Sequence, residues 1–116
     1  MSEPTAPPER SAPPVGSVVR LWHGWVETVH RSEYIEYMDR AGMSGYRETP
    51  GNLGAYIMSR DHEDGRSTIV TVSYWESFDA IRAFAGDEID RARFEPEEEQ
   101  YLVDREWIVT HFTVGA

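Results

Sequence analysis

Residues 69–75 form the segment IVTVSYW, which carries no charged side chain on either of the two faces that a β-strand presents. Its branched and aromatic residues favour a strand. The chain as a whole is strongly acidic, with a formal net charge of −10 over 116 residues. A strand that is apolar or uncharged on both faces must be covered on both sides, and this requirement limits the folds that are open to so short a chain.

Composition excludes several classes of protein. A chain of 116 residues has room for one domain with one core. The acidic balance argues against nucleic acid and anionic membranes as partners, because both require a cationic surface. The absence of cysteine excludes disulfides and thiolate chemistry, and the four histidines show no recognised metal spacing, so we expect no metal. With no apolar run long enough for a membrane span or a secretion signal, a cytoplasmic protein is expected.

The N-terminal residues 1–16 differ from the rest of the chain. They contain five of the seven prolines and almost no apolar residue that could pack in a core. We expect a disordered, Pro-rich tail here. The folded domain is then predicted to span residues 17–116.

The remaining sequence alternates between strand and helix patterns. Strands are predicted over residues 17–26, 53–60, 69–75 and 105–114. Ser32 is the expected N-cap of a first helix, which Gly42 or Gly45 ends, and Ser77 and Gly86 are expected to bound a second helix. A short further helix from Asp87 to Arg93 and a solvent-exposed acidic loop over residues 95–100 complete the prediction.

The order strand, helix, strand, strand, helix, strand predicts an α+β, ferredoxin-like fold with one antiparallel sheet. Both helices then lie on one face of the sheet and leave the other face bare. That face carries either Val70, Val72 and Tyr74 or the alternating set of Ile69, Thr71 and Trp75. Exposing either set would leave a large apolar patch, which usually marks an interface. We therefore expect a homodimer whose two sheets meet as a barrel.

Several segments also resemble a known family, the dimeric α+β barrel proteins grouped with the antibiotic biosynthesis monooxygenases, within a branch of small single-domain members. The segment WESFDAIRAFAG at residues 75–86 is the most specific, and VVRLWHGWV, the region from Ser32 to Met58 and VTHFTV add weaker likeness. The resemblance implies a pocket between sheet and helices that binds a small aromatic molecule. Characterised members oxidise polyketide phenols or anthrones to quinones with O₂ and without metal or flavin, whereas others degrade heme or act as cyclases or isomerases.

The resemblance and the strand positions together suggest catalytic roles for Trp75 and His23. Trp75 matches a pocket tryptophan of such monooxygenases, where an indole can stack on a planar substrate; the alternative is a residue that only fills the core. His23 can accept a phenolic proton if its side chain faces the helices, and is otherwise a hydrogen-bonded structural histidine. Its neighbours Trp22 and Trp25 are expected to contact the substrate.

Three further residues are candidates for substrate binding. Arg20 points away from His23 on the same strand and, if buried, must pair with an acidic side chain or an anionic substrate group. Arg93 stands near the position where heme-degrading relatives carry a histidine. Without that histidine the chain lacks a ligand for heme iron, so we do not expect heme, and we expect no cofactor. Arg93 then holds a substrate oxygen or makes a surface ion pair. His111 is expected close to the dimer interface.

Three functions remain open from the sequence. The first is a cofactor-free monooxygenase acting on a planar phenolic or polyketide-like molecule. The second is a non-oxidative enzyme with the same pocket, such as a polyketide cyclase or isomerase. The third is a binding or scaffold dimer whose own aromatic side chains fill the pocket, which the four tryptophans and six tyrosines would allow.

Overall fold

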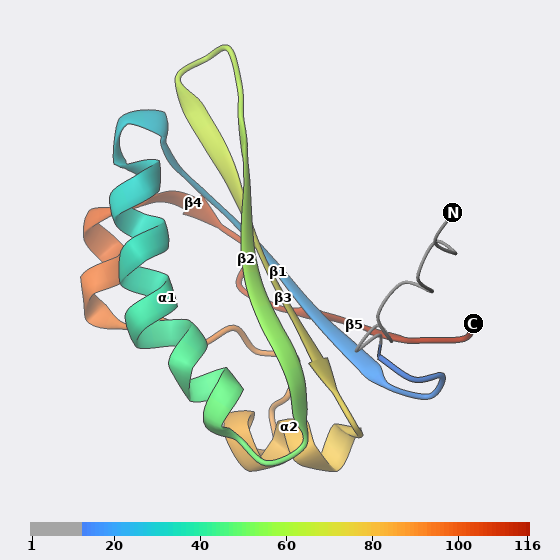
Figure 1. Ribbon diagram of the computed structural model, residues 1–116. Helices are drawn as coiled ribbons and strands as arrows, with labels where there is room; N and C mark the ends of the chain where they lie inside the picture. The colour runs from blue at the N-terminus through green and yellow to red at the C-terminus, as the bar shows by residue number, and fades with distance from the viewer. Residues whose placement is uncertain (1–12) are drawn as a thin grey trace, which may run out of the picture.

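The chain folds into a five-stranded antiparallel sheet with its helices on one side, seen nearly edge-on in Figure 1. The computed structural model describes residues 13–116. The strands are β1 (Val18–Glu27), β2 (Asn52–Asp61), β3 (Arg66–Trp75), β4 (Leu102–Arg105) and β5 (Thr110–Thr113). The helices are α1 (Arg31–Glu48) and α2 (Phe78–Ala85), with short 3₁₀ turns η1 (Thr28–His30) and η2 (Pro96–Gln100).

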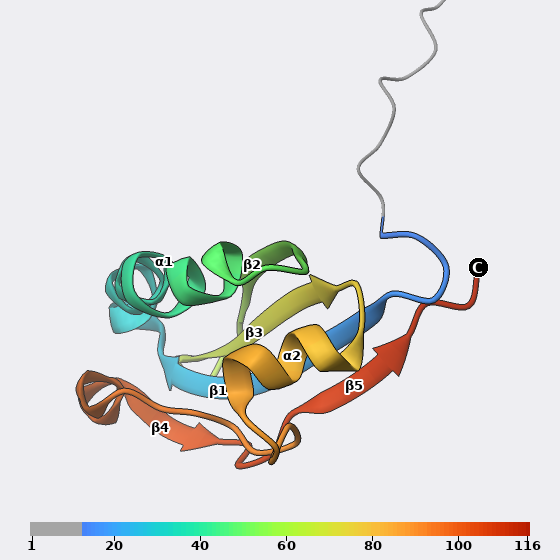
Figure 2. The ribbon, with the colours of Figure 1, turned by 90° about the horizontal axis from the view of Figure 1, so that it is seen from below.

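Strand order confirms the predicted ferredoxin-like α+β fold. The sheet runs β2-β3-β1-β4, and β5 also pairs with β1. Figure 2 shows β4 and β5 following one another along the same edge of β1. The single last strand predicted over residues 105–114 is therefore wrong in detail. The backbone leaves the β1 ladder between the two strands, where the Val109 N–H donates to the Asp90 carbonyl at 2.7 Å.

The first helix is longer than the sequence pattern predicts. It begins after His30 rather than Ser32 and continues through Gly42 and Gly45 as far as Glu48. Met43, in the extension, is fully buried against the core, and this packing outweighs the low helix propensity of the two glycines. The second helix has the predicted ends, because the Ser77 hydroxyl accepts a hydrogen bond from the Ala80 N–H at 3.2 Å and Gly86 follows the last residue.

The short helix predicted from Asp87 to Arg93 is wrong, since this segment has no helical structure. The buried Arg20 side chain of β1 explains the difference. Its guanidinium donates to the carbonyls of Ile89 and Arg91, which a helix would have used internally. The segment is held as an irregular crossing over the sheet.

The acidic loop predicted over residues 95–100 is also corrected. These residues form η2, which begins with Pro96. Glu95 and Glu98 cap one another, each side chain accepting from the other residue's backbone N–H. Glu98 is only 2% exposed, so the prediction of a fully solvated acidic face is wrong at this residue.

The predicted tail falls mostly outside the described residues, which exclude 1–12. Its last part, residues 13–16, forms a turn beside the end of the sheet. The Gly16 N–H donates to the Val114 carbonyl at 2.8 Å, and the Ser17 N–H donates to the Pro14 carbonyl at 3.0 Å. The described fold therefore includes a few residues that precede the predicted boundary.

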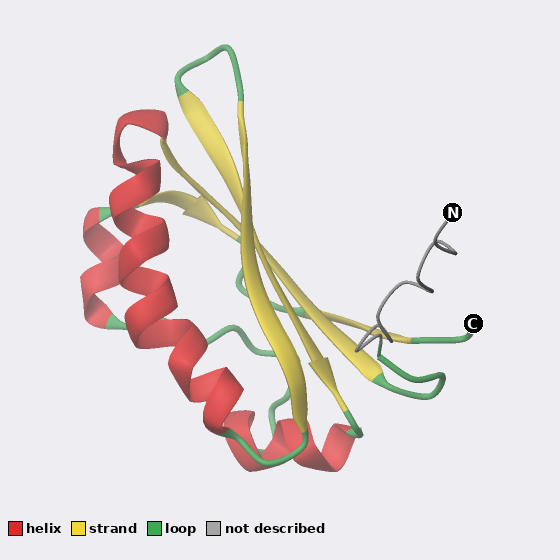
Figure 3. Cartoon of the chain, viewed as in Figure 1, coloured by secondary structure: helices red, strands yellow, loops and turns green. Residues whose placement is uncertain are grey.

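The sheet has one covered and one uncovered face. On the helix side, Trp22, Val26, Ile69 and Trp75 are buried in the core. Val72 and its neighbours of the same alternation, Val70 and Tyr74, lie on the opposite face, as the first of the two predicted sets requires. In the helix and strand colouring of Figure 3, every helix of the described chain lies on the other side. None of the helices within residues 13–116 is long and apolar enough to cross a membrane.

The uncovered face is apolar at its centre and at both sides. Tyr56 and Met58 of β2 are 57% and 49% exposed, and Phe112 of β5 is 56% exposed. Tyr56 packs edge-on against Tyr74, with ring centroids 6.4 Å apart. We call the surface formed by Leu21, His23, Trp25, Tyr56, Met58, Val70, Val72, Tyr74 and Phe112 the bare sheet face.

Candidate ligand-binding site

A cavity of about 170 Å³ lies between the sheet and its helices and opens to solvent on one side. Its walls come from α1, α2, the centres of β1 and β3, and the segment that leads into η2. The lining residues are mostly apolar: Trp22, Met38, Ala41, Gly42, Met43, Gly45, Tyr46, Thr71, Phe84, Ala92, Arg93, Phe94, Glu95, Glu98 and Val109. Such a hollow, which combines apolar walls with several polar groups, is typical of a small-molecule site.

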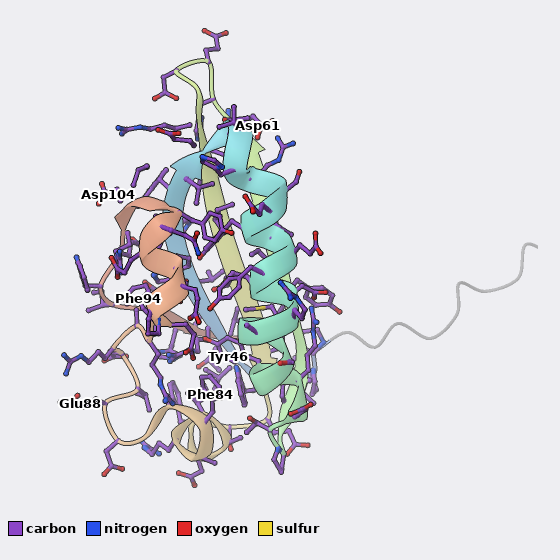
Figure 4. All side chains as sticks on the ribbon, turned by 90° about the vertical axis from the view of Figure 1, so that its left-hand side faces the viewer. Tyr46, Asp61, Phe84, Glu88, Phe94 and Asp104 are labelled. Carbon is purple, nitrogen blue, oxygen red and sulfur yellow. The ribbon has the colours of Figure 1, made fainter. Side chains whose placement is uncertain are left out.

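Four aromatic rings surround the cavity. Tyr46 stacks on Phe84 with ring centroids 4.4 Å apart, and Trp22 meets Phe94 edge-on at 5.8 Å. Figure 4 shows Tyr46, Phe84 and Phe94 arriving from α1, α2 and the segment before η2. Because α1 is distant in sequence from the other two elements, only the completed fold brings Tyr46 together with Phe84 and Phe94.

Small residues keep the cavity open. Gly42 and Gly45 place no side chain on the part of α1 that lines it. On β1, Gly24 makes room for the Trp22 ring, since a Cβ atom at Gly24 would lie 2.2 Å from a carbon of that ring. The Trp22 indole N–H donates to the Glu106 carbonyl at 2.7 Å, which fixes the ring against the cavity wall.

One carboxylate, that of Glu98, lines the cavity from a buried position. Its Oε1 atom accepts a hydrogen bond from the Tyr34 hydroxyl at 2.9 Å, and Oε2 accepts from the Glu95 N–H at 2.8 Å. Burial raises the pKa of Glu98 above its usual range, against the opposing effect of those two hydrogen bonds. The same burial, together with the Glu98 charge, raises the pKa of the Tyr34 hydroxyl.

Arg93 is a predicted substrate-binding residue that lines the cavity and brings a positive charge to it. Its guanidinium donates to the Phe84 carbonyl at 2.6 Å and lies over the Phe84 ring, 5.4 Å from the centroid. None of the ion pairs among residues 13–116 involves Arg93. The side chain is exposed, so some of its N–H groups remain open to solvent.

Trp75 lies beneath the cavity rather than on its wall. Its side chain is fully buried, and its indole N–H donates to the Ser73 hydroxyl at 2.8 Å. It touches the lining through Tyr46, with ring centroids 5.8 Å apart. In this arrangement Trp75 supports Tyr46 and Phe84 from below, and its N–H group is already used.

The Arg20 side chain faces the helices, on the opposite face of β1 from His23, as predicted. It does not contact an acidic side chain directly. Besides the carbonyls of Ile89 and Arg91, it donates through Nε to the Tyr46 hydroxyl at 3.3 Å. A second contact joins Arg20 Nη1 to His111 Nε2 at 3.1 Å. Arg20 therefore holds Tyr46, a lining residue, while lying outside the lining itself.

His111 is part of the same network. Its side chain is 6% exposed and packs edge-on against Phe78, and its Nδ1 atom lies 3.1 Å from an Asp90 carboxylate oxygen. Burial and the nearby Arg20 charge lower the pKa of His111. Because Arg20 can only donate, Nε2 of His111 is the acceptor, and Nδ1 carries the proton donated to Asp90.

His23 and Trp25 lie on the other side of the sheet from the cavity. The sheet alternation that directs Trp22 toward the helices directs these two neighbours to the bare sheet face. His23 Nδ1 lies 2.8 Å from Oε1 of Glu106, and the histidine side chain is 42% exposed. The condition on which the catalytic hypothesis for His23 depended, that it face the helices, is not met.

No group of three or more histidine and acidic side chains in residues 13–116 is arranged to hold a metal ion. The polar groups of the cavity wall are instead the carboxylates of Glu95 and Glu98, the Arg93 guanidinium and hydroxyls. This set can bind and orient a small ring by hydrogen bonds.

Comparison with solved structures gives the same fold. A crystal structure from Bacillus cereus, described as a "putative antibiotic biosynthesis monooxygenase", matches with a TM-score of 0.61 and 12% sequence identity. The match covers 86% of this chain and 94% of the other. No protein-family model and no curated protein matches the sequence. The chain therefore belongs to the class of proteins with a ferredoxin-like α+β fold. At 12% sequence identity, the similarity is evidence for the fold alone.

Sequence reasoning missed most of the cavity wall, including Tyr46, Phe84 and Glu98. Tyr46 lies beyond the predicted end of the first helix, and Phe84 lies inside the second helix, where a single aromatic residue does not distinguish a cavity wall from ordinary core. Glu98 was hidden in a run of acidic residues. The pattern Glu95-Pro96-Glu97-Glu98 was an available signal, since an acidic side chain three residues after a capping residue with proline between is typical of a capped turn.

Proposed function

We propose that this protein is a cofactor-free monooxygenase-like enzyme that acts on a small planar phenolic or polyketide-like molecule. The observation that carries the proposal is the cavity between sheet and helices, enclosed by four aromatic rings. The fold shared with the Bacillus cereus protein supports it. Flat aromatic walls favour a planar ligand, because offset and edge-on ring contacts stabilise it beyond simple burial.

The reaction needs little chemistry from the protein. A substrate with an acidic CH₂ group beside a ring carbonyl loses a proton to water at the open side of the cavity, and the resulting enolate passes an electron to O₂. Recombination gives a peroxide, and its collapse turns the CH₂ into a carbonyl with release of one water. The protein excludes water and holds the ring in place through Trp22 and Phe94, and Arg93 faces the anion at the open side.

We also propose that the functional unit is a homodimer formed through the bare sheet face. Exposed tyrosine, methionine and phenylalanine side chains lie around the buried centre of this face. A contiguous exposed apolar patch usually marks a surface that a partner covers. His23 and Trp25 then belong to the dimer interface rather than to the active site.

The dimer is tested by placing a charge at the centre of that face. Val72→Arg is expected to shift the protein from dimer to monomer in sedimentation velocity at low micromolar concentration. Val29→Arg is the matched control, because Val29 is 83% exposed in η1, away from the sheet, and should leave the dimer intact. A wild-type protein that sediments as a folded monomer at this concentration would remove the dimer proposal.

The oxygenase is tested by O₂ uptake in metal-free protein with an anthrone-like substrate. Phe84→Ala is expected to slow turnover by at least tenfold, whereas Val29→Ala, at an exposed position of η1, should not slow the chemical step. Turnover without O₂ consumption would assign the cavity to a cyclase. Absence of any turnover with anthrones or related phenols would count against the oxygenase.

One observation favours a second candidate, a binding protein without catalysis. The Trp75 N–H is used by Ser73, and Arg20 is used by backbone carbonyls and His111. Both groups are thus engaged in holding the fold. Ligand binding in the cavity with no change of the ligand under air would support this candidate over the enzyme.

A further inference from the structure

We infer that Glu98 is the specificity residue of the cavity and that it selects a neutral single ring carrying an O–H or N–H donor. The inference rests on the proposed use of this cavity for a small molecule, and it deepens that proposal by naming the ligand class. Three observations support it: the position of Glu98, the unused capacity of its oxygens and the size of the cavity.

The position of Glu98 is unusual for a carboxylate in so acidic a chain. It lines the cavity beside apolar residues of β1 and α1, such as Trp22 and Met38, and is 2% exposed. Its neighbours in η2 are bound to other partners at the surface: Glu99 forms two hydrogen bonds with Arg105, both 2.7 Å long, and Glu97 accepts from Tyr37 at 3.4 Å. Glu98 alone among these three faces inward.

Both carboxylate oxygens have capacity left. Each oxygen of an ionised carboxylate can accept about two hydrogen bonds. Among the described residues, Oε1 accepts one from Tyr34 and Oε2 accepts one from the Glu95 N–H. These two bonds fix the group in place and leave acceptor sites for a ligand donor, and a bond to an ionised acceptor is roughly twice as strong as a neutral one.

The size of the cavity limits the ligand to about one ring. Its volume of about 170 Å³ is close to that of a ~150 Å³ apolar protein cavity that holds benzene. A larger substrate must extend its remaining atoms through the open side. A ligand carboxylate is excluded from the inner wall, because it would meet the Glu98 charge with water removed.

The test compares phenol with toluene, two rings of nearly equal size of which only phenol carries a donor. Toluene is the more apolar ligand, so a purely apolar cavity would prefer it. We expect phenol to bind the wild-type protein at least as tightly as toluene at pH 7.5, measured by NMR titration. We expect benzoate to bind more weakly than either. A toluene affinity above that of phenol, benzoate binding tighter than phenol, or no binding of phenol would each overturn the inference.

Variants assign the preference to Glu98. In Glu98→Gln the ratio of phenol to toluene affinity should fall by about tenfold, the effect of losing a charge-assisted bond. Glu97→Gln is the matched control, one residue earlier in η2, and should leave the ratio unchanged. An unchanged ratio in a folded Glu98→Gln protein would show that Glu98 does not select the ligand.

A pH titration of the wild-type protein provides a readout that does not depend on the folding of a variant. The groups facing Glu98 are Tyr34 and Tyr37 of α1, Arg105 of β4 and Glu95. Of these groups only Glu95 is a second carboxylate, and toluene, which has no donor, is the control for any effect of pH on the cavity wall as a whole. The phenol preference should decline as pH falls through the raised pKa of Glu98, while toluene binding stays constant. A constant preference from pH 7.5 to the acid limit of folding would overturn the inference.

The two proposals fail separately. A phenol preference that depends on Glu98, with no O₂ uptake, would leave the selectivity intact and remove the oxygenase. Oxygen-dependent turnover, together with a phenol-to-toluene affinity ratio that Glu98→Gln does not change, would leave the oxygenase intact and remove the selectivity.

Discussion

Arg20 and His111 are hydrogen-bonded across adjacent strands, with Arg20 Nη1 3.1 Å from His111 Nε2. The two residues are direct neighbours in the register of β1 and β5. Through this pair a buried cation is linked to the exposed carboxylate of Asp90 and to the carbonyls of the segment that follows α2. The network positions the wall of the cavity while taking no part in lining it.

Removal of the Arg20 guanidinium should destabilise the fold. In Arg20→Met the carbonyls of Ile89 and Arg91 lose their donors, at about 1–3 kcal/mol for each buried group left unsatisfied. Urea unfolding should therefore show a lower midpoint with an unchanged slope. Arg60→Met is the control, because Arg60 is exposed on the edge strand β2 and forms no ion pair within the described chain. Equal midpoints for the two variants would contradict the structural role of Arg20.

The lowered pKa of His111 predicts a loss of stability on acidification. In the unfolded chain a histidine has a pKa near ~6.5, whereas burial and Arg20 lower it in the fold. The unfolded state therefore binds more protons in the window below ~6.5, and stability falls as pH decreases through that window. The facing charged groups are Arg20 and Asp90.

The measurement is the free energy of unfolding at pH 7.5 and at pH 5.5. His111→Gln keeps an acceptor toward Arg20 but does not titrate, so its loss of stability between the two pH values should be smaller than that of the wild-type protein. Parallel pH profiles for both proteins would show that His111 does not titrate with a lowered pKa.

The buried hydrogen bond from the Trp75 indole N–H to the Ser73 hydroxyl predicts that Ser73 contributes to the stability of the fold. Ser73→Ala removes the acceptor of the buried Trp75 N–H and should lower stability by about 1–3 kcal/mol. Ser32→Ala, at an exposed position of α1, should have little effect. If Ser73→Ala is neutral in thermal unfolding but abolishes ligand turnover, Trp75 has the catalytic role that the sequence resemblance implied.

The sequence predicts the strand and helix order because that order depends on local patterns, such as the alternation in residues 69–75 and the cap at Ser77. It also restricts the bare sheet face to two sets of residues. It does not predict which face Arg20 and His23 take, since both faces of β1 are largely uncharged and the register is fixed only when β3 and β5 pair with it. The burial of Glu98 likewise depends on Tyr34, which lies 64 residues away in sequence.

Gly24 offers a test of the cavity wall in which none of the lining residues is substituted. A methyl group at this position would lie 2.2 Å from the Trp22 ring, so Gly24→Ala must move that ring. Crowding of this kind destabilises a core by about 1–3 kcal/mol. Because Trp22 lines the cavity, the variant should also weaken phenol and toluene binding together by at least severalfold.

The control is Gly115→Ala, where an added methyl group meets nothing within 4 Å. Equal loss of both ligands separates this effect from that of Glu98→Gln, which should weaken phenol selectively. Unaltered binding of both ligands in a folded Gly24→Ala protein would mean that the ligands bind away from Trp22, and the cavity would lose its role as the binding site.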